Sequence, residues 1–267
     1  MLFYIVAETI GVIVPMEHDA LKEIVKEFEK TLDRKHKVIV KNAMGDSNLQ
    51  RSIIQYFNTQ KIDLFAPIGT AATQMTTSIA RGKNILGIAS YQVKGAKVLQ
   101  DEVTAEPILN LIKENFSNIK TLALVYSHNE KILPEIKHAQ EVCKKLNINV
   151  QLMPVYTAQD IYTVSKSIKA EGVLILKDHI VVSGLTTLLK IGLPVFASDH
   201  ISVQKGALCA IGVHEGDIGI AAAQLSNKLL KGEQLADVSH MKTLKVFVNK
   251  DKTKGMTLKT SYEKVYY

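Results

Sequence analysis

Short apolar runs alternate along this chain with longer amphipathic stretches, and this alternation restricts the possible folds more than any other feature. Runs such as TIGVIVP (9–15) and TLALVYS (121–127) have the length of buried strands. Strands that alternate with helices are typical of βαβ units and parallel sheets. The pattern predicts strands at 9–15, 36–43, 63–69, 84–90, 121–127, 149–155, 172–178, 193–199, 207–213 and 244–249. It predicts helices at 18–34, 46–60, 70–81, 104–116, 129–146, 158–170, 180–191 and 215–231.

The pattern breaks near its middle, at the polar, glycine-containing connection YQVKGAKVLQDEV (91–103). A second break falls near GVHEGD (212–217), where the last long helix is followed by one further strand. We therefore expect an α/β fold of two doubly wound, Rossmann-like lobes joined by a hinge. The predicted N-terminal lobe comprises residues 1–99 and 216–240, and the predicted C-terminal lobe comprises residues 100–215 and 241–267.

The net charge of +7 raises the question of a nucleic-acid partner. The lysines are interleaved with glutamates, as in ALKEIVKEFEKTLDRKHK (20–37), which favours solvated helix surfaces over a basic stripe. We expect no nucleic-acid partner. No apolar run approaches the roughly 20 residues that span a bilayer. Cys143 and Cys209 lie in a helix-like and a strand-like segment, which indicates small buried apolar side chains.

Polar side chains follow two predicted strands of the first lobe, at the edge where doubly wound sheets bind ligands. Glu17 and His18 come after the first strand, either as a polar rim of a ligand site or as part of a helix cap. Gly69, Thr70 and Ala71 come after the third strand. Small residues there leave helix amides open to a carboxylate or phosphate, although an ordinary capped helix has the same spacing.

Two predicted strands of the second lobe each end in an Asp-His pair, Asp178-His179 and Asp199-His200. A buried aspartate needs a partner, so such a residue at a cleft suits a cationic group such as a ligand ammonium. Acid and imidazole side chains can also bind a metal, but the chain has no HExxH spacing. Ser183 or Ser202 could be nucleophiles, but no GxSxG motif occurs. We expect no metal, no cofactor and no catalysis.

Three segments resemble extracytoplasmic solute-binding proteins of ABC importers, in the branch that includes tryptophan- and aromatic-amino-acid-binding members. These segments are IGVIVPMEHDAL (10–21), DLFAPIGTAATQ (63–74) and residues 195–238, which begin VFASDHISVQKGAL. The resemblance extends over residues 9–258. It implies a type I periplasmic-binding fold whose lobes close on a small, amino-acid-like ligand, and the branch points to an aromatic one. It also implies a monomer that is periplasmic or extracellular and membrane-associated, and that docks on an ABC permease driven by an ATPase.

The resemblance assigns the ligand carboxylate to the turn at Thr70. It places Glu17 and His18 at the border of the site in the same lobe, and Asp178 and Asp199 on the other lobe, facing the ligand. Tyr91 is a candidate aromatic wall. The full set of expected ligand contacts is Glu17, His18, Gly69, Thr70, Ala71, Gln74, Tyr91, Ser127, Asp178, His179 and Asp199. The family pattern differs at YSHNEKILP (126–134), at IASYQVKGAKV (88–98) and after Asp178, which are ligand-facing positions in the family. The alternative function is a ligand-sensing module of a regulatory or receptor system with the same fold.

Overall fold

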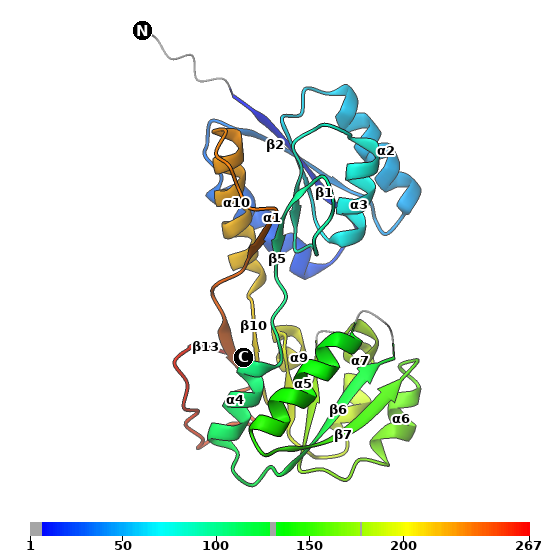
Figure 1. The fold of residues 1–267 in the computed structure, drawn as a ribbon, viewed down its shortest axis with the longest axis vertical. Coiled ribbons are helices and arrows are strands. Elements are labelled where there is room, and N and C mark those ends of the chain that lie inside the picture. The colour runs from blue at the N-terminus through cyan, green and yellow to red at the C-terminus, as the bar shows by residue number, and fades with distance from the viewer. Residues whose placement is uncertain (1–6, 129–131, 177) are drawn as a thin grey trace. The chain divides into compact units, whose positions relative to one another are not determined.

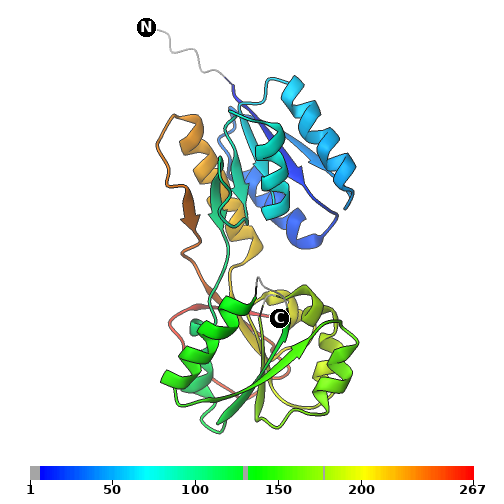
Figure 2. The same cartoon turned by 45° about the vertical axis from the view of Figure 1, so that its right-hand side comes forward.

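A computed structural model describes residues 7–128, 132–176 and 178–267 (Figures 1 and 2). The chain divides into two compact units. Unit 1 comprises Met1–Glu102 and Val213–Thr243, and unit 2 comprises Val103–Gly212 and Leu244–Tyr267. Each unit consists of helices packed on a sheet whose strands are mostly parallel, so the predicted α/β class is confirmed. None of the described helices combines the length and the apolar content that a bilayer crossing requires.

The strands of unit 1 lie in the order β2-β1-β3 and β4-β5-β11, and single bridges between Phe65 and Ile85 and between Ile68 and Ile88 connect the two groups. All of these pairs are parallel. The strands are β1 (Thr9–Val14), β2 (Lys37–Asn42), β3 (Leu64–Pro67), β4 (Leu86–Ile88), β5 (Lys97–Gln100) and β11 (Val238–His240). The helices are α1 (Asp19–Thr31), α2 (Ser47–Thr59), α3 (Thr70–Ile79) and α10 (Glu215–Leu230).

Helix α10 returns to unit 1 late in the chain and packs against α1 (Figure 1). Helix α1 buries Ile24 and Phe28, which are four residues apart and therefore lie on one face. On α10, Gly219 allows the two backbones to approach closely, because a Cβ atom there would overlap the carbonyl oxygen of Ile24. A separate cluster around Phe57 and Phe65 joins α2 to the sheet.

Unit 2 contains a sheet with the strand order β13-β12-β10-β9-β8-β6-β7, in which only the β10–β12 pair is antiparallel. The strands are β6 (Thr121–Ser127), β7 (Asn149–Val155), β8 (Gly172–Ile175), β9 (Val195–Ala197), β10 (Cys209–Gly212), β12 (Lys245–Val248) and β13 (Glu263–Tyr266). The helices are α4 (Glu106–Asn115), α5 (Leu133–Lys145), α6 (Asp160–Ser165), α7 (His179–Ser183), α8 (Leu185–Leu189) and α9 (His200–Gln204).

Helices cover both faces of the unit 2 sheet, as a doubly wound fold requires. Along β6, Leu122 and Leu124 belong to the core cluster with α4 and α5. Ala123 and Val125 belong to the cluster with α6, α7, α8 and α9. This alternation follows from the two-residue period of a strand that is buried on both faces. Cys143 and Cys209 are both buried and free, as the sequence predicted, and burial raises their pKa values to about 11 and about 12.

Several predicted boundaries were wrong. The predicted helix at 180–191 is two short helices, α7 and α8, that meet at Gly184, where a Cβ atom would overlap the side chain of Ile161. Only Asp160–Ser165 of the helix predicted at 158–170 is helical, as α6. The strands β5, β11 and β13 and the helix α9 were not predicted from the sequence. Each of these elements has only three to five residues, which is too short for a clear periodic pattern.

Candidate functional site

The carboxyl end of β3 leads directly into helix α3 through Gly69. Gly69 has φ 89° and ψ 155°, a combination that is essentially restricted to glycine. As the N-cap residue it offers no side-chain oxygen to the first turn. In the described part of the chain, the N–H groups of Thr70, Ala71 and Ala72 meet no protein acceptor, and that of Thr73 donates to the Gly69 carbonyl. The first turn of α3 is therefore an uncapped, partly positive helix end.

Thr70 and Tyr91 lie next to each other at this helix end. The backbone N–H of Tyr91 donates to Oγ1 of Thr70 over 3.0 Å. The side chain of Tyr91 is 50% exposed, and its hydroxyl donates to Oε1 of Glu102 over 3.0 Å. Ala71 is exposed beside Thr70, and Gln74 is exposed one turn further along α3. The structure thus brings together Gly69, Thr70, Ala71 and Tyr91, with Gln74 on the next turn.

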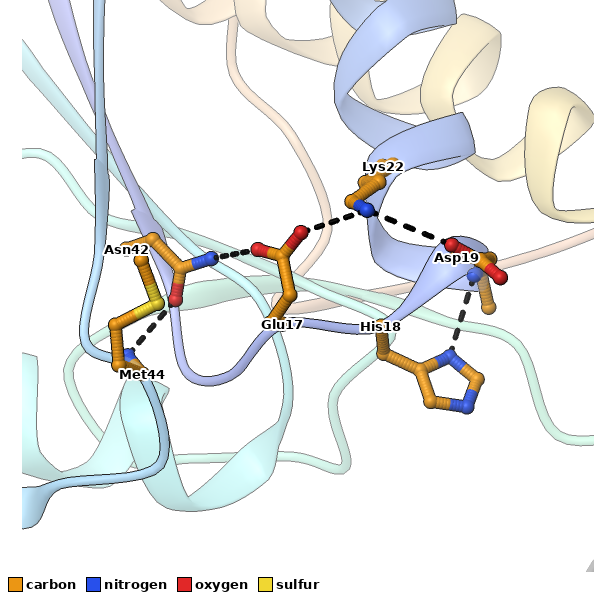
Figure 3. Close-up of polar contacts among 7 residues, drawn as sticks. Glu17, His18, Asp19, Lys22, Asn42 and Met44 are labelled. Atoms are coloured by element: carbon orange, nitrogen blue, oxygen red, sulfur yellow. Dashed lines mark hydrogen bonds and ion pairs between the residues drawn. The ribbon is translucent and has the colours of Figure 1, made fainter.

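Glu17 and His18 belong to a second group, between β1, α1 and β2 (Figure 3). His18 is the N-cap of α1, and its Nδ1 accepts a hydrogen bond from the Ala20 N–H over 3.2 Å. Glu17 accepts from the Asn42 side-chain amide over 2.8 Å and forms a 2.6 Å ion pair with Lys22. In Figure 3 the carboxylate of Glu17 lies between Asn42 and Lys22, while the His18 ring points away from them. The exposed Glu17 carboxylate raises the pKa of Lys22 through this hydrogen bond.

A cavity of about 290 Å³ lies beside this second group. Its apolar wall consists of Val14, Met16, Leu21, Val25 and Val40. In the part of the chain that the structure describes, no hydrogen bond connects Glu17 or His18 to Gly69 or Thr70. The predicted contacts of unit 1 follow the carboxyl ends of the paired strands β1 and β3, one set at the start of α1 and one at the start of α3.

In unit 2, Ser127 and Asp178 meet at the carboxyl ends of two paired strands, β6 and β8. Oδ2 of Asp178 accepts the Ser127 backbone N–H over 2.7 Å. Oδ1 of Asp178 caps α7 by accepting the N–H groups of Ile180 and Val181 at 3.0 and 3.4 Å. Asp178 is only 6% exposed, and these backbone donors compensate for the burial of its carboxylate. His179 begins α7, but its side chain lies outside the described part of the structure.

Asp199 caps α9 in the same way, at the end of the adjacent strand β9. Its carboxylate accepts the backbone N–H of Ser202 at 2.8 Å and the hydroxyl of Ser202 at 2.7 Å. The ring of His200 packs against Phe247 and Tyr267. The respective centroid distances are 5.4 and 5.9 Å. Asp178 and Asp199 are thus both helix caps at one sheet edge, and a carboxylate has lone pairs for further donors.

Glu102 and Gln100 also belong to the group around Tyr91, although neither is among the contacts predicted from the sequence. Glu102 accepts hydrogen bonds from the Tyr91 hydroxyl and from the Gln100 side-chain amide. Both residues lie in the segment 91–103, whose polar, glycine-containing sequence predicts a connection between the lobes. The segment contains β5, and a prediction of that strand would have placed its end beside the end of β4.

Comparisons with known proteins place these features in context. A family model described as ABC transporter substrate binding protein matches residues 9–265. An uncharacterised protein of Rickettsia prowazekii is 32% identical over 254 residues, which cover 90% of this chain and 82% of that protein. A tyrosine-binding protein of Clostridioides difficile is 24% identical, with 97% of this chain and 84% of that protein covered. The solved structure of an ABC domain in complex with L-Trp from Streptococcus pneumoniae has a TM-score of 0.76 and 21% identity, with 97% of this chain and 100% of that chain covered.

Proposed function

Because the chain belongs to the family of ABC transporter substrate-binding proteins, we propose that it captures an α-amino acid with an aromatic side chain. The two units act as the lobes that close on the ligand. The protein works as a monomer in the periplasm or at the cell surface, and it delivers the ligand unchanged to a permease and its ATPase. The family match over residues 9–265 favours transport over the regulatory alternative.

The uncapped start of α3 carries this proposal. Three N–H groups, those of Thr70, Ala71 and Ala72, point from the helix end without a described acceptor, and an amino-acid carboxylate satisfies such donors. A Cβ atom on Gly69 would meet nothing within 4 Å, so the space before the helix is open. Helix-end contacts to an anion are typically worth about 0.3–1 kcal/mol each when exposed and up to about 2 kcal/mol when partly buried.

Tyr91 supports an aromatic ligand. Its backbone lies beside the first turn of α3, because its N–H is hydrogen-bonded to Thr70, and its ring is exposed. An aromatic side chain gains from an aromatic neighbour through offset or edge-to-face contact, worth about 0.5–1.5 kcal/mol beyond burial. Two similar proteins also support an aromatic ligand, since one is named a tyrosine-binding protein and the structure of the other is a complex with L-Trp. In unit 2, the carboxylates of Asp178 and Asp199 are acceptors for the ligand ammonium group.

The proposal is tested by thermal-shift assays with the twenty amino acids and a set of sugars, followed by native mass spectrometry of the strongest hits. We expect L-tryptophan, L-tyrosine or L-phenylalanine to raise the melting temperature most and to bind with one-to-one stoichiometry. A sugar that stabilises the protein while no amino acid does so would contradict the proposal.

A variant with an added negative charge tests whether the ligand carboxylate binds at the start of α3. Ala71→Asp puts a negative charge on the exposed first turn of α3, and we expect at least about tenfold weaker amino-acid binding, equal to about 1.4 kcal/mol. Gln55→Asp is the matched control, because it adds the same charge on the exposed surface of α2. Equal affinities for the two variants would argue against α3 as the carboxylate site.

A further inference from the structure

The ring of Tyr91 is exposed, yet it is held at both ends. Its backbone N–H donates to Thr70 and its hydroxyl donates to Oε1 of Glu102, each over 3.0 Å. An exposed tyrosine normally samples several rotamers, and ordering it on binding reduces affinity. Here the hydroxyl bond to Glu102 restrains the ring before any ligand arrives, and the N–H bond to Thr70 fixes the backbone that carries it.

Glu102 is itself held in place. Its second oxygen, Oε2, accepts a hydrogen bond from the side-chain amide of Gln100 over 2.7 Å. Gln100 is the last residue of β5, and its backbone carbonyl accepts the N–H of Met241, which follows the neighbouring strand β11. A continuous series of contacts therefore runs from the sheet through Gln100 and Glu102 to the Tyr91 hydroxyl.

We propose that Glu102 and Gln100 are positioning residues that fix the Tyr91 ring as a wall beside the start of α3, and so favour ligands with a ring. This inference rests on the proposed function, because it assigns Tyr91 to the ligand site. The hydroxyl is engaged by Glu102, so the ring itself is the part of Tyr91 that a ligand meets. Prior ordering of one such side chain is expected to improve affinity by about two- to tenfold.

Calorimetric titrations with L-tryptophan and L-leucine test the effect on selectivity. We expect Glu102→Ala and Tyr91→Phe each to weaken tryptophan binding about two- to tenfold and to affect leucine less. The double variant is expected to be no weaker than either single variant, because both remove the same hydrogen bond. Glu102→Gln keeps an oxygen acceptor and should restore most of the affinity. Glu233→Ala, which changes another exposed glutamate of unit 1, should bind like the parent protein.

A second readout needs no ligand. With 3-fluorotyrosine at position 91, the ¹⁹F resonance should move toward that of free fluorotyrosine in Glu102→Ala and stay near the parent position in Glu102→Gln. An unchanged resonance in Glu102→Ala would overturn the positioning role. Equal losses for tryptophan and leucine, or additive losses in the double variant, would also overturn it. If the parent protein binds no amino acid, the proposed function fails and the resonance alone decides whether Glu102 positions Tyr91.

Discussion

Gly219→Ala is the substitution whose effect can be worked out most fully from the structure. Gly219 is buried on α10 where this helix crosses α1. An added Cβ atom would overlap the carbonyl oxygen of Ile24 and would lie 2.9 Å from the backbone nitrogen of Phe28. Both neighbours are backbone atoms in the middle of α1, so neither can rotate away. The added methyl group can be accommodated only if the two helices move apart.

Two opposing effects set the size of the change. Alanine is a better helix former than glycine by about 0.8–1.0 kcal/mol, which favours the variant. Overpacking of a filled core costs about 1–3 kcal/mol, and a clash with backbone lies at the upper end of that range. We therefore expect unit 1 to lose about 1–2 kcal/mol of unfolding free energy. Gly216→Ala is the matched control on the same helix, because the nearest atom to its Cβ would be Nδ1 of His214 at 3.3 Å.

The assay is urea denaturation followed by circular dichroism, together with hydrogen exchange of peptides from α1. Gly219→Ala should unfold at lower urea concentration and should accelerate exchange in Asp19–Thr31. Gly216→Ala should be neutral or slightly more stable. If both variants were equally stable, α10 would not pack on α1 as described, and residues 213–243 would not complete unit 1.

Three further predictions concern single side chains. Gly69→Ala forces a residue with a Cβ atom to φ 89°, which should cost about 1–3 kcal/mol of stability in thermal denaturation; an unchanged melting temperature would refute this. Asp178→Ala leaves the N–H of Ser127 and the start of α7 without their acceptor. We therefore expect the free energy of unfolding, measured by urea denaturation, to fall by about 1–3 kcal/mol, and a fall below about 0.5 kcal/mol would argue against the cap. Burial raises the pKa of Cys143 to about 11 and that of Cys209 to about 12, so both thiols stay protonated at pH 8. A disulfide reagent at pH 8 should therefore label neither thiol until urea is added. Rapid labelling of the native protein would contradict their burial.

Much of the fold followed from the sequence because its longer elements carry strong patterns. The strands β1 and β6 are continuous apolar runs, and α1 places Ile24 and Phe28 one turn apart. The short elements were less predictable. Gly184 divides one predicted helix into α7 and α8 because Ile161, more than twenty residues earlier, occupies the space that a side chain would need. A tertiary contact of this kind leaves no signal in a local window of sequence.

The candidate site was predictable only in part. The rule that ligands bind at strand ends selected Gly69, Thr70 and Asp178, and each of them lies at such an end. The same rule could not separate a ligand contact from a helix cap, and both Asp178 and Asp199 are caps in the structure. The hydrogen bond between Tyr91 and Glu102 was not predictable, because it depends on the pairing of β4 with β5.

The most direct test of the central claim is a calorimetric comparison of L-tryptophan with tryptamine, which has the same ring and ammonium group but no carboxylate. If the start of α3 binds the carboxylate of an aromatic amino acid, L-tryptophan should bind with one-to-one stoichiometry and tryptamine at least about a hundredfold more weakly, a difference of about 2.7 kcal/mol. Equal affinity for the two compounds, or no binding of either L-tryptophan or L-tyrosine, would contradict the account.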